Sequence, residues 1–100
     1  MTYAQTLTAL ADPTRRKLFD RLRKRPHAVG ELAAALKVSQ PAVSQHLAVL
    51  KKARLVTSTP DGKRRLYRPD RAGIAALREY IDGMWDDVLR AYVASFEKER

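Results

Sequence analysis

The 100-residue sequence contains no cysteine. This absence excludes disulfides, thiol redox switches, thiolate metal sites and thiol nucleophiles. Uncharged apolar runs are far shorter than a membrane span, so a transmembrane segment is not expected. The N-terminus has no basic patch followed by an apolar run, so we expect no signal peptide and a cytoplasmic protein.

Catalytic motifs are also missing. The sequence has no glycine-rich phosphate-binding motif, and neither His27 nor His46 has a partner acid at metal-binding or catalytic spacing. We therefore expect neither an enzyme nor a protein with a cofactor. Internal repeats and low-complexity segments are absent, and the length suits one domain over residues 1–100.

The charge that is present is strongly positive and unevenly distributed. Twenty Lys and Arg against eleven Asp and Glu give a net charge of +9. Residues 1–71 carry sixteen basic and five acidic side chains, whereas residues 72–100 carry four and six. A generically basic surface is one interpretation. The segregation favours nucleic-acid binding, because phosphate neutralisation needs cations gathered on one face.

Two helices are predicted before Pro26, the proline that ends the second of them. The first covers about residues 4–10 and is expected to bury Leu7 and Leu10. Asp12 is a good N-cap and is followed by a proline, so a second helix is predicted over residues 13–24. Its apolar side is formed by Leu18, Phe19 and Leu22.

A helix-turn-helix is predicted over residues 29–53. Its first helix, about 29–36, is expected to be poorly capped because Ala28 stands at its N-cap. After a tight connection, Ser39 caps the recognition helix, about 40–53, with a proline in its first turn. The recognition helix has a stripe at buried spacing, formed by Val43, Leu47 and Leu50.

A hairpin and a long helix complete the chain. Strands are predicted over 56–59 and 63–68 around an Asp-Gly turn at 60–62, which would make residues 56–68 a wing. Asp70 caps a final helix over about 70–98. The fold class expected is therefore mainly α with a small β-hairpin, a winged helix-turn-helix with a long C-terminal helix.

Short polar side chains at the start of a recognition helix can reach base edges in the major groove, and a basic wing can reach the backbone or the minor groove. Gln45 can bind adenine with two hydrogen bonds. Ser39 could act as a cap alone, the glutamines as solvated surface, and the basic hairpin as a blunted sheet edge. The predicted DNA-binding residues are Ser39, Gln40, Pro41, Ser44, Gln45, His46, Lys51, Lys63, Arg64 and Arg65.

Five segments, in order and at the expected spacing, give the sequence a family resemblance across roughly residues 7–70. They are ALADPTRR at 9–16, VGELA at 29–33, VSQPAVSQHL at 38–47, VLKKARLV at 49–56 and DGKRRLY at 61–67. With these segments the sequence resembles the ArsR family of bacterial repressors. The resemblance implies a homodimeric repressor, each half reading one arm of an inverted-repeat operator in double-stranded DNA.

The same resemblance implies a dimer interface built from the first and last helices. It agrees with the apolar surface of the last helix, which exceeds what one small core needs unless the helix packs across its own domain. The predicted interface residues are Leu7, Leu10, Ile74, Leu77, Ile81, Met84, Trp85, Val88 and Tyr92.

Many members of this family sense metals through a cysteine cluster before the turn or through Asp and His pairs in the final helix. Here residues 32–36 read LAAAL, and the final helix has Glu79, Asp82, Asp86 and Asp87 but no histidine. Transition metals prefer imidazole or thiolate ligands, so we expect no metal and a solvated acidic face. The sequence thus resembles the metal-independent branch.

Two other functional classes remain as alternatives. Winged helices also serve as protein-interaction modules without sequence-specific DNA binding, and the last helix could be the docking surface. The basic recognition helix and wing argue against this reading. An enzyme is the least supported class, because the sequence lacks the motifs that catalysis would need.

Overall fold

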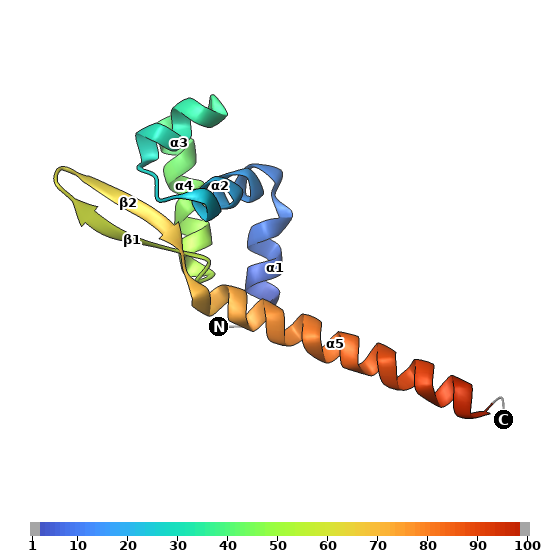
Figure 1. The fold of residues 1–100 in the computed structure, drawn as a ribbon. Coiled ribbons are helices and arrows are strands. Elements are labelled where there is room, and N and C mark those ends of the chain that lie inside the picture. Colours follow the sequence, from blue (N-terminus) through green and yellow to red (C-terminus); the bar gives the residue numbers. More distant parts are fainter. Residues whose placement is uncertain (1–2, 99–100) are drawn as a thin grey trace.

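The computed structural model describes residues 3–98 and has the expected winged helix-turn-helix architecture (Figure 1). Its elements are α1 (Tyr3–Ala11), α2 (Pro13–Lys24), α3 (Val29–Leu36), α4 (Gln40–Lys52), β1 (Val56–Asp61), β2 (Arg64–Pro69) and α5 (Arg71–Lys98). The predicted bounds of the second and third helices are confirmed. The recognition helix ends one residue earlier than predicted, because Ala53 is its C-cap.

Hydrogen bonds at the α1–α2 junction explain where α2 begins. The Asp12 carboxylate accepts from the Arg15 backbone N–H at 3.0 Å, and Pro13 occupies the first helical position. The arginines that follow fold back onto the end of α1. Arg15 Nε donates to the Ala9 carbonyl at 2.7 Å, and Arg16 Nη1 donates to the Leu10 carbonyl at 3.0 Å. These side chains satisfy carbonyls that a helix C-terminus leaves without partners.

The core lies where α1, α2, α3 and α4 meet, and the start of β1 closes it. The apolar stripes predicted for α2 and α4 are both buried, as expected from their spacing. The core side chains are Ala9, Leu18, Phe19, Leu22, Leu32, Ala33, Val43, Leu47, Leu50, Ala53, Leu55 and Val56.

The prediction for α1 was wrong about which side chains it buries. Thr6 and Ala9 face the body, while Leu10 is half-buried and Leu7 is exposed. Thr6 and Ala9 are small and lie on one face of the helix, so α1 can approach α4 and α5 closely. Leu7 lies about 100° around the helix from Thr6 and points away from that face.

The predicted hairpin turn at residues 60–62 was also wrong. The strands pair from Val56–Pro69 to Asp61–Arg64, which leaves Gly62 and Lys63 as a two-residue loop. Gly62 has a φ of 63°, the positive value that tight hairpin loops require. The proline at position 60 is tolerated within β1 because both strands of a two-stranded sheet are edges.

α5 begins at a backbone joint with the turn that follows α4. The Asp70 carboxylate accepts from the Ala72 N–H at 3.0 Å, so the predicted cap is present. The Gly73 N–H then donates to the Arg54 carbonyl at 2.8 Å. A Cβ at Gly73 would come within 2.5 Å of that carbonyl oxygen, so the contact depends on glycine.

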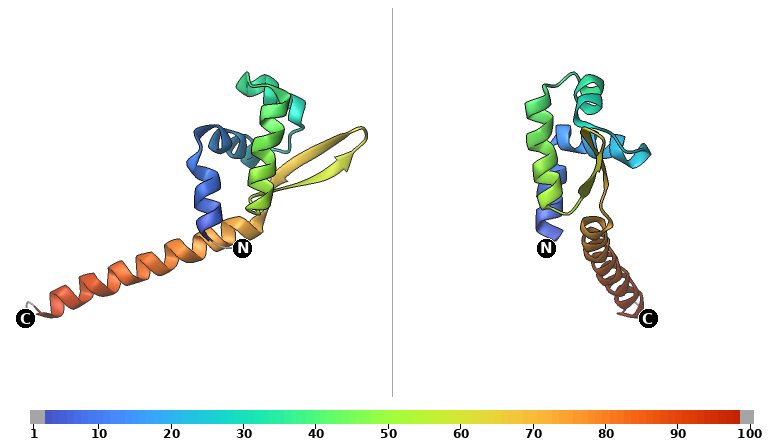
Figure 2. Two further views of the ribbon diagram at one scale, coloured as in Figure 1. Left: turned by 180° about the vertical axis from the view of Figure 1, so that it is seen from behind. Right: turned by 90° about the vertical axis from the view of Figure 1, so that its left-hand side faces the viewer.

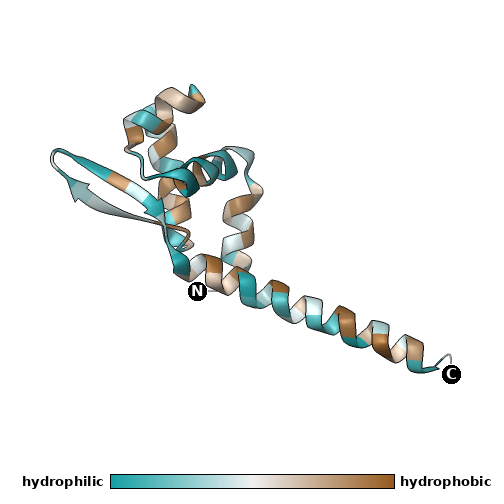
Figure 3. Cartoon of the chain, viewed as in Figure 1, coloured by the Kyte–Doolittle hydropathy of each residue, from teal (hydrophilic) through white to brown (hydrophobic). Residues whose placement is uncertain are grey.

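Beyond this joint α5 leaves the rest of the molecule (Figure 2). Tyr3 of α1 stacks on Tyr80 of α5, with ring centroids 4.0 Å apart, and fastens the first half of the helix. The remainder projects freely and gives the chain principal extents of 67 × 24 × 21 Å. Hydrophobic residues recur along this projecting part to its end (Figure 3).

Candidate nucleic-acid interface

The recognition helix α4 is held by its buried stripe and exposes most of the side chains predicted to read DNA. Val43, Leu47 and Leu50 are at most 1% exposed, so the helix is fixed against α2 and α3. The opposite side is open. The exposed predicted residues of the turn and α4 are Ser39, Gln40, Pro41, Ser44, Gln45 and Lys51.

The turn between α3 and α4 sets where the recognition helix starts. Lys37 adopts the left-handed conformation, with φ of 56°, and its N–H bonds to the Ala33 carbonyl. Ser39 then caps α4, its hydroxyl accepting from the Ala42 N–H at 3.3 Å. The capping role predicted for Ser39 is therefore confirmed, and its hydroxyl is occupied by the hydrogen bond at the start of α4.

His46 differs from the other predicted α4 residues because it is half-buried. It lies near Asp12, the cap of α2, and its charge acts on that carboxylate. The hydrogen bond from the Arg15 N–H lowers the pKa of Asp12, and the charges of Arg15 and His46 lower it further. His46 is thus less open to DNA than Ser44 and Gln45, which are exposed.

The wing meets the helix-turn-helix at a hollow of about 280 Å³. His27 and Tyr67 exchange backbone hydrogen bonds of 3.1 and 2.8 Å, which fasten β2 to the segment before α3. The His27 side chain is buried, and its Nδ1 lies 2.8 Å from the Arg25 carbonyl. The hollow brings α4 and the wing together, with lining residues Ala28, Val29, Gly30, Gln40, Arg64, Arg65 and Tyr67.

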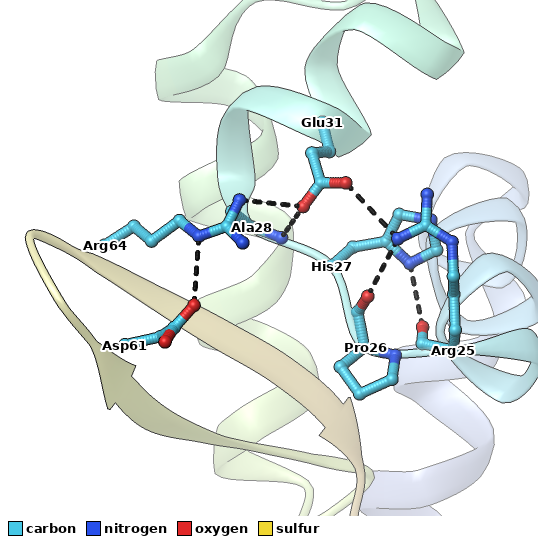
Figure 4. A network of polar contacts seen from close by, with 7 residues as sticks. All are labelled: Arg25, Pro26, His27, Ala28, Glu31, Asp61 and Arg64. Atoms are coloured by element: carbon cyan, nitrogen blue, oxygen red, sulfur yellow. Dashed lines mark hydrogen bonds and ion pairs between the residues drawn. The ribbon is translucent and has the colours of Figure 1, made fainter.

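A polar network spans this junction, centred on Glu31 (Figure 4). Its carboxylate accepts from the Ala28 N–H at 3.0 Å, from Arg25 Nη1 at 3.3 Å and from Arg64 Nη1 at 3.4 Å. The Ala28 hydrogen bond lowers the pKa of Glu31, and the Arg25 hydrogen bond and charge lower it further, followed by the charge of Arg64. As expected, Ala28 offers no side-chain cap to α3. Glu31 at the third helical position supplies the reciprocal half of a capping box by accepting from the Ala28 N–H.

The cations predicted for the wing have different surroundings. Arg64 also bonds Asp61, with Nε 3.2 Å from the carboxylate, so two acids hold its guanidinium. Arg65 Nε donates to the Ser58 hydroxyl at 3.1 Å across the hairpin. Lys63 stands in the exposed loop and forms no ion pair with any residue that the structure describes. Three cations that look equivalent in sequence therefore have three different roles in the wing.

Comparison with known proteins identifies the family. The model of the bacterial regulatory protein, arsR family, matches residues 12–58. The HTH-type transcriptional regulator Rv2034 of Mycobacterium tuberculosis is 54% identical over 91 residues, which are 91% of this chain and 85% of that protein. The chain belongs to the ArsR family. It is therefore a DNA-binding transcriptional regulator and not an enzyme.

Other ArsR-family proteins are similar over different shares of the chain. An ArsR-like transcriptional regulator from Rhodococcus sp. RHA1 superposes with a TM-score of 0.74 at 31% identity, covering 90% of this chain and 88% of the other. The repressor SmtB of Mycobacterium tuberculosis is 47% identical over 64 residues, which are 64% of this chain but 47% of SmtB.

This ArsR-family chain has no cysteine, and among residues 3–98 no group of three or more histidine and carboxylate side chains could hold a metal ion. The acids of α5 form a solvated face, as predicted. Asp82 pairs with Arg78 at 3.7 Å and Asp87 pairs with Arg90 at 3.5 Å, all highly exposed. Within the described part of the chain, no helix is both long enough and apolar enough to cross a membrane.

Two features of this ArsR-family site were missed in the sequence. Glu31 was assigned no role, although an acid three residues after a helix N-cap is a recognised capping signal that could have revealed it. The stack between Tyr3 and Tyr80 had no local signal, because it joins residues at opposite ends of the chain.

Proposed function

We propose that this ArsR-family regulator is a homodimeric repressor that binds an inverted-repeat operator, one recognition helix to each arm. The observation that carries the proposal is the uncovered apolar length of α5. Residues 74–98 include no buried side chain, and Trp85, Val88 and Tyr92 are each more than half exposed. So large an apolar surface is favoured in water only when another apolar surface covers it. A second copy related by two-fold symmetry supplies one.

The surface proposed for the dimer extends from α5 onto α1. Tyr3 stacks on Tyr80, so the N-terminal end of α1 contacts α5. The exposure of Leu7 supports this use, because its side chain is 44% exposed and takes no part in the core. The proposed interface residues remain Leu7, Leu10, Ile74, Leu77, Ile81, Met84, Trp85, Val88 and Tyr92.

For DNA reading we propose that the open side of α4 enters the major groove. Gln45 is exposed in the N-terminal half of a helix held by its buried stripe, as bidentate readout of adenine requires. The positive end of the α4 dipole favours a phosphate. Lys63 and Arg65 of the wing contact phosphates of the DNA backbone. Repression follows by occluding a promoter, and the missing thiolates and ligand clusters support a mode of action without a bound metal.

Selection of duplexes tests this proposal. The full-length chain is mixed with fragmented genomic DNA at low salt, the bound fragments are sequenced, and the recovered site is measured by titration at several salt concentrations. We expect an inverted repeat and a binding constant that falls steeply with salt. A protein without DNA affinity at low salt would overturn the proposal and leave the protein-interaction alternative.

A second measurement separates sequence-specific base contacts from non-specific electrostatic binding to DNA. Gln45→Ala should weaken binding to the recovered site by about 1–3 kcal/mol and leave binding to unrelated duplex nearly unchanged. Equal loss on both duplexes would contradict base readout by Gln45. A repression assay with the recovered site between promoter and reporter tests the direction of regulation.

A further inference from the structure

We infer that Glu31 is a positioning residue for the wing. It would act through a wing brace, defined as Glu31 with Arg25, Arg64 and Asp61, that holds the hairpin at the angle which DNA binding needs. The inference rests on the proposed function for its DNA readout and adds to it a residue that makes no DNA contact itself. It also reassigns Arg64 from phosphate contact to support of the wing.

The geometry shows why the wing needs a brace. A two-stranded sheet is marginally stable alone, and here its backbone pairs with the rest of the chain at Tyr67, near its base. Arg64 lies three residues nearer the tip. Its bond to Glu31 is the contact that reaches from the tip back to α3, across 33 positions of sequence (Figure 4).

The guanidinium of Arg64 lies at the surface and bonds two acids of the same chain. Nη1 lies 3.4 Å from Glu31 and Nε lies 3.2 Å from Asp61, one partner on α3 and one on β1. A planar fork suits such a two-partner role. Arg25 approaches the other oxygen of Glu31 at 3.3 Å, so the carboxylate is held between two cations and the end of a helix.

The direction in which DNA affinity changes when Glu31 loses its charge distinguishes a brace from an ordinary surface acid. DNA is a polyanion, so removing an acid beside the DNA-binding face should strengthen binding when that acid only repels phosphates. A brace predicts the reverse, because loss of the acid frees the wing. Glu31→Gln is the informative change, since its amide oxygen can still accept from the Ala28 N–H and keep α3 capped.

The test uses the full-length chain and the duplex recovered by selection. Glu31→Gln should bind that duplex about two- to fivefold more weakly than the wild type, the range expected for exposed ion pairs. Asp20→Asn is the matched control, because it makes the same charge change at another exposed pair, with Arg23 on α2. Binding by Glu31→Gln that equals or exceeds that of the control would overturn the inference.

A double-mutant cycle with Arg64→Gln tests the partner. The combined variant should lose less than the product of the two single losses, because each change alone breaks the same bond. Multiplicative losses would show that Arg64 acts apart from Glu31 and would also overturn the brace.

Amide hydrogen exchange of the free protein gives a readout without DNA. Exchange at residues 62–65 should speed up in Glu31→Gln and stay unchanged in Asp20→Asn, while thermal melting confirms that both variants are folded. Unchanged exchange in Glu31→Gln would refute the brace. When the wild type binds no duplex, the proposed function fails, and the exchange measurement still decides on the brace.

Discussion

The packed body, residues 3–73, and the projecting part of α5, residues 74–98, contain the same kinds of apolar side chains in opposite surroundings. In the body Leu18, Leu32 and Leu50 are fully buried. In the projecting part Trp85 is 60% and Tyr92 is 62% exposed. The body buries most of its large apolar side chains within the chain, whereas the projecting helix leaves its own uncovered.

Charge divides the two parts in the same way. Residues 1–71 carry a net charge of +11 and residues 72–100 carry −2. Ion pairs on α5 lie on its polar side and keep that side in water. This division agrees with the proposed function, in which the body attracts DNA and α5 mediates self-association, and the two parts can be tested separately.

The largest expected effect is in the body. Leu47→Ala empties part of the core and should lower the free energy of unfolding by about 2–5 kcal/mol, independent of protein concentration. Urea unfolding at several concentrations measures it. Val49→Ala is the control on the same helix, because Val49 is 42% exposed, and it should cost less than about 1 kcal/mol. Similar losses for both would contradict the core assignment.

The next effect is on the projecting helix. Val88→Asp places a charge in the proposed interface and should weaken self-association by about thirtyfold or more, as at a hot-spot residue. Sedimentation over a range of concentrations measures the change. Ala94→Asp adds the same charge about 120° around α5 from Val88, outside the proposed interface, and should leave association intact. A wild type that is monomeric at micromolar concentration would contradict the proposed self-association through α5.

The joint between the two parts gives a smaller effect. Gly73→Ala should destabilise the chain by about 1–2 kcal/mol, because backbone overlap outweighs the roughly 1 kcal/mol that alanine gains in a helix. Gly83→Ala is the matched control, since nothing lies within 4 Å of its added Cβ. It should stabilise α5 slightly. Thermal unfolding compares the two variants, and a neutral Gly73→Ala would contradict the close contact.

The smallest effect depends on pH and also belongs to the body. The pKa values of Asp12 and Glu31 are lowered by hydrogen bonds and neighbouring cations, so folding favours their ionised forms. Their contribution to stability is present above the ordinary carboxyl pKa of about 4 and is lost as the pH falls through the lower folded values. Unfolding between neutral and acid pH should show less loss for Asp12→Asn, which keeps a good cap without titrating. An identical pH profile would contradict the Asp12 contribution.

Local signals predicted most of the fold. The caps at Asp12, Ser39 and Asp70 marked three helix starts, and apolar spacing located the buried stripes of α2 and α4. α1 was harder, because its buried face is made of Thr6 and Ala9. Residues so small give almost no hydrophobic signal, and the neighbouring leucines gave a misleading one.

The sequence predicted which residues belong to the candidate site. It did not predict which of them bond other residues of the chain. Counting cations treats Arg64, Arg65 and Lys63 alike, yet the two arginines bond acids or hydroxyls within the chain. Arg15 and Arg16 similarly hold carbonyls of α1. The partners are set by tertiary folding, and the forked guanidinium suits such internal bonds better than an ammonium does.

The joint at Gly73 has a consequence for how such a protein can diverge. The turn that follows the recognition helix is hydrogen-bonded to the start of α5, through backbone groups of Arg54, Leu55, Asp70 and Gly73. Substituting the surrounding side chains leaves those groups unchanged. In the proposed dimer, these backbone bonds would keep the distance between the two recognition helices the same among related proteins. The bases that each recognition helix prefers could still change through substitutions on the open face of α4.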